Sequence, residues 1–167
     1  QVFANKRSQK PFVFNGEVAS VFDDMICRSV PGYTVFQDVV KRIANTSLKN
    51  KHTVLDIGCS TGTTLLEISK ACQSLDLEFI GIDNSPEMLE KAKVKLEIMA
   101  HNHHLDLMRI DLNQTFPELN SPINLCTMIL TLQFIKPENR DTLLESIFRN
   151  LQKQSPLIFC SLLIWFS

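Results

Sequence analysis

From Thr53 onward, short apolar segments alternate with amphipathic ones, and this alternation limits the possible folds more than any other feature of the chain. Five segments rich in apolar and β-branched residues are predicted strands: 53–57, 78–82, 105–110, 123–132 and 157–164. Segments with apolar residues at helical spacing lie between most of them. Strands that are apolar along their length and separated by helices indicate a parallel sheet covered on both faces. We therefore predict a doubly wound α/β domain.

The predicted helices of this region have recognisable boundaries. One follows Gly62 and ends near Cys72. The next starts at Ser85-Pro86-Glu87, which combines a serine N-cap, a proline at the first helical position and an acidic residue in the first turn. The last opens at Pro137 and carries an apolar face of Leu143, Leu144, Ile147, Phe148 and Leu151.

The N-terminal third is predicted to be helical. Its first helix has an apolar face of Val18, Val21, Phe22, Met25 and Ile26, and Pro31-Gly32 ends it. A second helix carries Val35, Phe36, Val39, Val40 and Ile43 on one side, and the polar run 45–52 is a predicted linker. We expect residues 1–52 to be a helical extension or lid on a core of residues 53–167, the whole forming effectively one domain.

Charge and hydropathy argue against two classes of function. Seventeen basic and eighteen acidic residues give a net charge of −1, so no basic field favours direct nucleic-acid binding. The most apolar stretch, 157–166, has ten residues, whereas a helix that spans a membrane needs roughly 20. Residues 1–10 lack the apolar segment of a signal peptide. We expect no membrane association.

The cysteines indicate a reducing compartment. There are five, with no C-x-x-C pair and no dense framework, which favours free thiols in the cytoplasm. Cys72, Cys126 and Cys160 fall in apolar patterns and are expected in the core.

The loop after the first predicted strand is the first candidate for a binding site, because ligands of such sheets bind at the carboxyl ends of the strands. It reads Asp56-Ile57-Gly58-Cys59-Ser60-Thr61-Gly62. Gly58 allows a sharp turn where the strand ends, and Gly62 allows the next helix to pack closely. The free amides at the start of that helix favour a carboxylate or a phosphate.

Two acids follow at the ends of the next strands. Asp83 lies 21 residues beyond Gly62 and can accept hydrogen bonds from both hydroxyls of a ribose. A capping role for Asp83 is less favoured because Ser85 already supplies the cap. Asp111 ends the third strand, where a carboxylate can accept from an adenine amino group, and a plain turn residue is the open alternative at this position. Together these positions predict a site for a nucleoside with an acidic or zwitterionic tail.

Other interpretations of these residues are weaker. Ser60 stands in a G-x-S-x-G sequence typical of hydrolase nucleophiles, but only helical sequence precedes this strand. Cys59 lies near a helix start that can stabilise a thiolate, yet a small residue beside the ligand is the preferred interpretation. His101, His103 and His104 are expected in a solvated loop, and no metal site is predicted.

The pattern Asp-x-Gly-x-x-x-Gly, followed by the acid after the second strand, resembles class I S-adenosylmethionine-dependent methyltransferases. A narrower resemblance is to the carboxy-S-adenosyl-L-methionine synthase family. It rests on the runs Phe14-Asn15-Gly16-Glu17-Val18-Ala19, Phe22-Asp23-Asp24-Met25-Ile26, Arg28-Ser29-Val30-Pro31-Gly32-Tyr33, Asp56-Ile57-Gly58-Cys59-Ser60, Gly81-Ile82-Asp83-Asn84-Ser85 and Thr131-Leu132-Gln133-Phe134. It covers most of residues 12–151 and implies a Rossmann-like class I methyltransferase fold.

The resemblance implies a function as well. Members convert prephenate and S-adenosylmethionine into carboxy-S-adenosylmethionine and phenylpyruvate, through a sulfonium ylide that captures the carboxyl group lost from prephenate. Their product serves a partner enzyme that modifies the wobble uridine of tRNA. The resemblance also implies a homodimer with prephenate as its small-molecule substrate, and it names no catalytic side chain.

Carried over by position, the resemblance implies a set of cofactor contacts. Tyr33 would contact the amino-acid end of the cofactor, and Gly58, Cys59 and Ser60 its methionyl part. Asp83 and Asn84 would lie at the ribose and adenine, and Asp111 and Leu112 beside the adenine.

The chain departs from the family pattern in two places. Ile129 stands where the family has an asparagine that contacts the cofactor. The family also continues well beyond the fifth strand, with an arginine for the extra carboxylate and further strands, so we expect a C-terminally truncated core that lacks those strands. A generic small-molecule methyltransferase and a non-catalytic remnant that binds a nucleoside or a partner chain remain alternatives.

Overall fold

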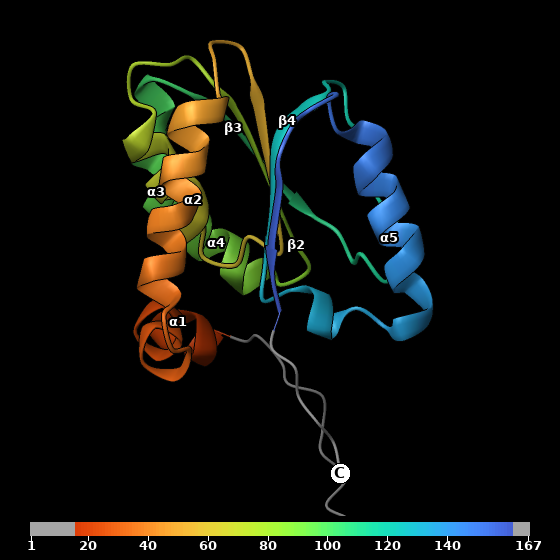
Figure 1. Ribbon diagram of the computed structural model, residues 1–167. Helices are drawn as coiled ribbons and strands as arrows, with labels where there is room; N and C mark the ends of the chain where they lie inside the picture. The colour runs from red at the N-terminus through yellow and green to blue at the C-terminus, as the bar shows by residue number, and fades with distance from the viewer. Residues whose placement is uncertain (1–15, 162–167) are drawn as a thin grey trace, which may run out of the picture.

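The computed structural model describes residues 16–161. It consists of one β-sheet with helices packed on both of its faces (Figure 1). The elements in chain order are α1 (Gly16–Ser29), α2 (Tyr33–Ser47), β1 (Thr53–Ile57), α3 (Thr63–Ala71), β2 (Glu78–Asp83), α4 (Pro86–Leu96), η1 (Glu97–His101), β3 (His104–Arg109), β4 (Ile123–Ile129), η2 (Leu132–Phe134), α5 (Pro137–Asn150) and β5 (Leu157–Cys160).

The sheet has the order β3-β2-β1-β4-β5, and every neighbouring pair is parallel. The chain builds outward from β1 through β2 to β3, then returns to the other side of β1 for β4 and β5. The strand order therefore reverses between β1 and β4, which is where such sheets bind ligands at their carboxyl edge. This arrangement confirms the predicted doubly wound fold.

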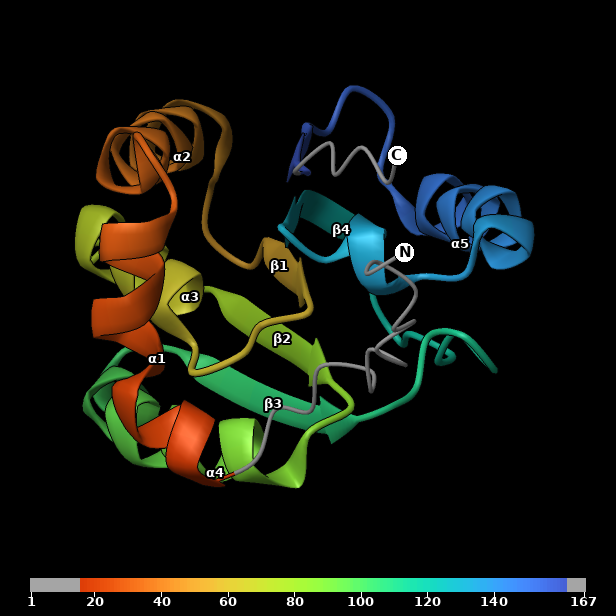
Figure 2. The ribbon, with the colours of Figure 1, turned by 90° about the horizontal axis from the view of Figure 1, so that it is seen from below.

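Helices cover both faces of the sheet. In Figures 1 and 2, α2, α3 and α4 lie on one face and α5 lies on the other. The first face packs Val40 of α2 and Leu65 of α3 against Val54 and Phe79, and the second packs Leu143 of α5 into a separate cluster. All five residues of β1 are buried, as expected for a central strand between two helical layers.

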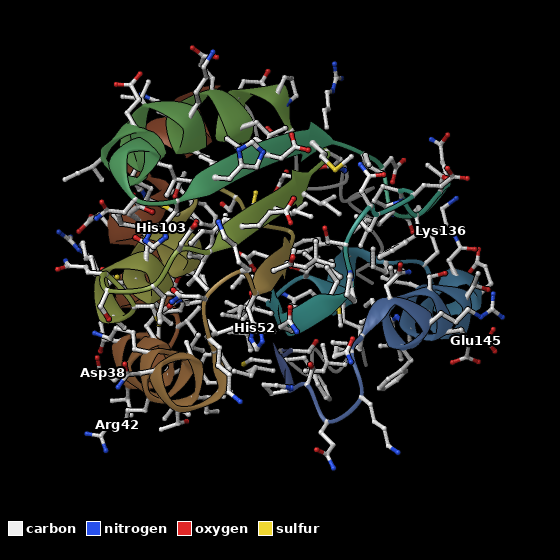
Figure 3. The ribbon with its side chains drawn as sticks, turned by 90° about the horizontal axis from the view of Figure 1, so that it is seen from above. Asp38, Arg42, His52, His103, Lys136 and Glu145 are labelled. Carbon is white, nitrogen blue, oxygen red and sulfur yellow. The ribbon has the colours of Figure 1, made fainter. Side chains whose placement is uncertain are left out.

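The polar surfaces of the two helical layers face outward. Seen from the edge opposite to that of Figure 2, Asp38 and Arg42 lie at the rim of α2, and Glu145 lies at the outer side of α5 (Figure 3). Among the described residues, no helix is long and apolar enough to cross a membrane.

The predicted start of α4 is confirmed. The Ser85 hydroxyl accepts a hydrogen bond from the Met88 amide at 3.2 Å, and Pro86 takes the first helical position. The cap fixes where the chain turns from β2 into α4, and so it fixes the residues between them at the carboxyl edge of the sheet.

The buried face of α2 is only partly the predicted one: Val40 is fully buried and Phe36 packs against the core, as expected. Val35 and Val39 are exposed (64% and 44%), and the buried stripe consists of Tyr33, Gln37, Val40 and Ala44. The hydropathy pattern missed Gln37, which can occupy this stripe because its amide bonds to the side chains of Tyr33 and Thr64. In α1, Val21 is likewise exposed, and the side chain of Val18 lies outside the described residues.

Several predicted boundaries differ from the structure. Helix α2 continues to Ser47, which shortens the expected 45–52 linker. Strand β4 ends at Ile129 and not at 132, because Leu130 turns the backbone with a φ of 58°. Strand β5 ends at Cys160, and the remainder of the segment expected up to 164 lies outside the described residues from 162 onward. The expectations for residues 1–10 fall outside the described part too.

Three side chains were assigned to the wrong environment. Phe148 of α5 is exposed, although it was expected on the apolar face. Cys160 is only partly buried because it lies on the edge strand. His103 is buried and not solvated: its ring packs edge-on against Phe79 at a centroid distance of 5.0 Å, on the side of the molecule shown in Figure 3.

Candidate functional site

The loop Gly58–Gly62 crosses the carboxyl edge of β1, the edge that faces the viewer in Figure 2. Gly58, Ser60 and Gly62 all have positive φ values, of 72°, 52° and 78°. A Cβ atom on Gly58 would lie 2.1 Å from Thr131 Oγ1, and one on Gly62 would lie 2.7 Å from Leu96 Cδ1. Both glycines therefore serve the turn and the close packing that the sequence predicted.

The loop is tied to the neighbouring strand by its backbone. The amides of Gly58 and Cys59 both donate to the Ile82 carbonyl, at 2.8 and 2.9 Å. The Gly62 amide donates to the Cys59 carbonyl at 2.8 Å, which closes the turn. These bonds hold the loop against the end of β2, where Asp83 lies.

Asp83 joins the loop to the start of α4. One carboxylate oxygen accepts from the Ser60 amide and the other from the Ser85 amide, both at 2.9 Å. Burial raises the pKa of Asp83, and backbone amides, including that of Asn84, oppose this rise. A carboxylate has about four acceptor sites, so each oxygen still has capacity for a ligand hydroxyl. The sequence had not indicated that Asp83 also holds the loop in place.

Asp56 is a buried acid beneath this loop. It is 2% exposed, and the Thr127 hydroxyl donates to one of its oxygens at 2.7 Å. Burial raises the pKa of Asp56 to about 7, and the negative charge of Asp83 acts in the same direction. A group with this pKa changes its charge in the neutral range, which makes Asp56 the most unusual acid of the site.

Tyr33 comes to the site from the N-terminal helices. Its hydroxyl accepts from the Gln37 amide at 3.0 Å, and the same amide nitrogen contacts Thr64 Oγ1 at 3.0 Å. Burial raises the pKa of Tyr33 to about 12, opposed by the Gln37 hydrogen bond and assisted by the charges of Asp56 and Asp23. Within residues 16–161, Gln37 Oε1 has no hydrogen-bond partner. Gln37 was not predicted from the sequence, where only its i+4 spacing from Tyr33 could have indicated it.

The segment after β3 lies next to β2. The Ile110 amide donates to the Asp83 carbonyl at 2.9 Å, so Asp111 follows directly beside the second strand. Asp111 accepts from the Asn113 amide and the Gln114 side chain, and these bonds lower the pKa of its carboxyl. The neighbouring Leu112 packs against the core cluster on the α5 side.

The remaining candidate residues occupy two different environments. Asn84 is exposed beside Asp83. Cys59 is buried, and burial raises the pKa of its thiol well above the ordinary value, so a thiolate nucleophile is not favoured there. Among the described residues, no group of histidine, cysteine and acidic side chains is arranged to hold a metal ion.

The structure thus links most of the predicted site residues to one another. Hydrogen bonds join the glycine loop to Asp83, and the backbone joins Asp83 to the segment that carries Asp111. The raised pKa of Tyr33 comes first from burial, and the negative charge of Asp56 adds to it. The acids Asp56, Asp83 and Asp111 at this carboxyl edge suit a positively charged nucleoside ligand.

Residues 54–154 match the family described as "Methyltransferase domain". This match, with the sheet order and the glycine loop, defines the chain as a class I methyltransferase domain. The carboxy-S-adenosyl-L-methionine synthase of Methylococcus capsulatus is 40% identical over 88% of this chain and 60% of that protein. The one of Campylobacter hominis is 38% identical over 99% of this chain and 67% of that protein. The chain belongs to the carboxy-S-adenosyl-L-methionine synthase family, and it spans about three fifths of the length of such relatives.

Solved structures show the same fold. The plantazolicin methyltransferase BpumL in complex with SAH superimposes with a TM-score of 0.64 and 25% identity, over 86% of this chain and 52% of that one. A putative S-adenosyl-L-methionine-dependent methyltransferase from Methanococcus maripaludis gives a TM-score of 0.71 at 18% identity, over 92% of this chain and 67% of that one.

Proposed function

We propose that this chain binds S-adenosylmethionine at the carboxyl edge of the sheet, with Asp83 accepting hydrogen bonds from the ribose hydroxyls. The observation that carries the proposal is the pair of Asp83 oxygens, which accept from the Ser60 and Ser85 amides and keep acceptor capacity for ligand hydroxyls. The names of the relatives and the SAH complex of BpumL support it. Because the amides already fix the carboxylate, it is oriented before the ligand arrives.

The other candidate residues take places around the same ligand. Gly58, Cys59 and Ser60 border the methionyl part, and Tyr33 contacts its amino-acid end. Asn84, Asp111 and Leu112 lie at the adenine. The buried Asp56 and the half-buried Asp83 suit the positive charge of the sulfonium. At Ile129, where the resemblance implies an asparagine, one polar contact is replaced by an apolar one.

The reaction that we propose for the complete protein is carboxyl transfer, with prephenate as the small-molecule substrate. Bound S-adenosylmethionine supplies a positively charged sulfur, which stabilises negative charge on the adjacent carbon. The chain's own part is to bind and orient the ligand and to keep charged groups fixed around it, which requires no nucleophilic side chain. A cytoplasmic homodimer whose product serves tRNA wobble-uridine modification follows from the family resemblance and belongs to the same proposal.

Methyl transfer to a small molecule is the second candidate, and the likeness to BpumL favours it. Mass spectrometry distinguishes the two after incubation of the chain with S-adenosylmethionine and prephenate. Carboxyl transfer adds the mass of carbon dioxide to the nucleoside and depends on prephenate. Methyl transfer yields S-adenosylhomocysteine and depends instead on an added small-molecule acceptor for the methyl group. Binding without turnover identifies this chain as a non-catalytic binding domain.

Asp83→Asn is expected to weaken S-adenosylmethionine binding about 100-fold, because it replaces a charged acceptor by an amide that keeps only one acceptor oxygen. Isothermal titration calorimetry of the purified chain measures this change. Asp106→Asn is the matched control, since it removes the same charge from an exposed position on β3. Equal affinity of Asp83→Asn and the unchanged chain would contradict a ribose contact at this position.

A further inference from the structure

A closed polar network joins the N-terminal helix to the glycine loop. Asp23 of α1 accepts from Thr61 Oγ1 at 2.6 Å and from Thr63 Oγ1 at 3.0 Å, both through one carboxylate oxygen. Its other oxygen accepts from Lys95 Nζ of α4 at 2.5 Å. The same ammonium donates to both threonine hydroxyls at 2.9 Å. We call these four residues the α1 latch.

The hydrogen-bond donors of the α1 latch match its acceptors in number. An ammonium has three donors, and Lys95 directs one to each of its three partners. Each threonine hydroxyl accepts from Lys95 and donates to Asp23, so it connects the cation to the anion. Partial burial raises the pKa of Asp23, but the bonds from Lys95 and the threonines outweigh that effect and leave the pKa below its ordinary value.

The α1 latch holds elements that are distant in sequence. Asp23 and Lys95 are 72 residues apart, and α1 contacts α4 near the carboxyl edge of the sheet (Figure 2). The Lys95 side chain is only 24% exposed and Thr61 only 2%, whereas the Asp23 side chain is 50% exposed. Such an ion pair is better protected from solvent and salt than a fully exposed one, which contributes little.

Thr61 lies inside the loop itself, between two residues with positive φ. Its neighbour Ser60 is bound to Asp83 through its amide, while Thr61 is bound to Asp23 through its hydroxyl. Two carboxylates from different elements therefore hold adjacent loop residues. Tyr33 begins α2 just after the turn that follows α1, and its amide donates to the Val30 carbonyl at 3.2 Å, so a short hydrogen-bonded turn connects α1 to Tyr33.

We propose that Asp23 and Lys95 are positioning residues that fasten α1 to the glycine loop and thereby hold the loop and Tyr33 in the arrangement that binds the nucleoside ligand. The identity of the ligand in this inference rests on the proposed function. The effect of the α1 latch on the loop does not depend on it. Neither residue is among those expected to contact the ligand. Their contribution to affinity is indirect and passes through Thr61 and Thr63.

The first test is hydrogen–deuterium exchange of the ligand-free full chain. Asp23→Asn and Lys95→Met are each expected to accelerate exchange of peptides covering 21–30 and 56–66 about tenfold, the scale of one charge-assisted hydrogen bond. The controls are Asp24→Asn and Lys93→Met, which remove the same charges from exposed neighbouring positions. Exchange in β4 and α5 should stay unchanged. Acceleration throughout the chain, or none in the loop, would overturn the proposal.

The second test is a double-mutant cycle on S-adenosylmethionine affinity by calorimetry. Each single variant should weaken binding about tenfold, and the double variant should be hardly weaker than either one, because the two residues act as a unit. Thr61→Ser keeps the hydroxyl and should bind normally, whereas Thr61→Val should behave like Asp23→Asn. Additive losses in the cycle would refute the coupling. If the unchanged chain binds no ligand while the loop exchange still responds, the proposed function fails and the hold of the α1 latch on the loop stands.

Discussion

Gly58→Ala is expected to destabilise the protein by about 3 kcal/mol, the largest effect expected among the described glycines. Two costs combine. The backbone of Gly58 has a φ of 72°, which disfavours any side chain, and the added Cβ would lie 2.1 Å from Thr131 Oγ1. Thr131 cannot simply rotate away without loss, because its hydroxyl donates to the Ile57 carbonyl at 2.9 Å.

Thermal and urea unfolding of Gly58→Ala and of the unchanged chain measure this loss of stability. For a domain of this size the loss corresponds to a fall in Tm of roughly 6 to 12 °C. Gly32→Ala separates the two costs, since Gly32 has a similar φ of 76° but open space around its Cβ position. It should lose only about 1 kcal/mol. Gly58→Ala combined with Thr131→Ala should recover part of the difference, and equal losses at Gly32 and Gly58 would argue against the steric cost.

Asp56→Asn is expected to have a higher free energy of unfolding than the unchanged chain, by a margin that grows as the pH rises from 4 to 7. The folded-state pKa of Asp56 lies at about 7, above its ordinary value of 3.8. An acid with a raised pKa gives its full stability below the unfolded-state pKa and loses it as the pH rises through the folded-state pKa. The loss corresponds to at most about 4 kcal/mol and is complete above pH 7. Asparagine carries no charge to desolvate.

Urea unfolding of both proteins between pH 4 and pH 9 measures the effect. The difference in the free energy of unfolding should grow from pH 4 to pH 7 and then remain constant. Thr127→Val supplies a second check, because the Thr127 hydrogen bond lowers the pKa of Asp56. Without that bond, the decline in stability should extend to higher pH. A difference between Asp56→Asn and the unchanged chain that does not vary with pH would contradict a raised pKa.

Local signals in the sequence were sufficient for the core. The apolar runs located β1 and β2, and Ser85-Pro86 fixed the start of α4, because N-capping depends on residues only a few positions apart. Gly58, Gly62 and Asp83 were recognisable as loop and strand-end residues. The pattern failed at Val35, Val39 and His103, where neighbours from other elements decide which side is buried.

The sequence by itself determined the parallel α/β fold, the glycine loop and the acids at the ends of the strands, since each depends on short-range residue order and periodicity. Only the tertiary structure decided that Asp83 holds Ser60, that Gln37 is buried against Tyr33, and that Asp23 meets Lys95. It also decided the raised pKa of Asp56. These features depend on distance and desolvation between residues far apart in the chain, and neither quantity can be read from residue order.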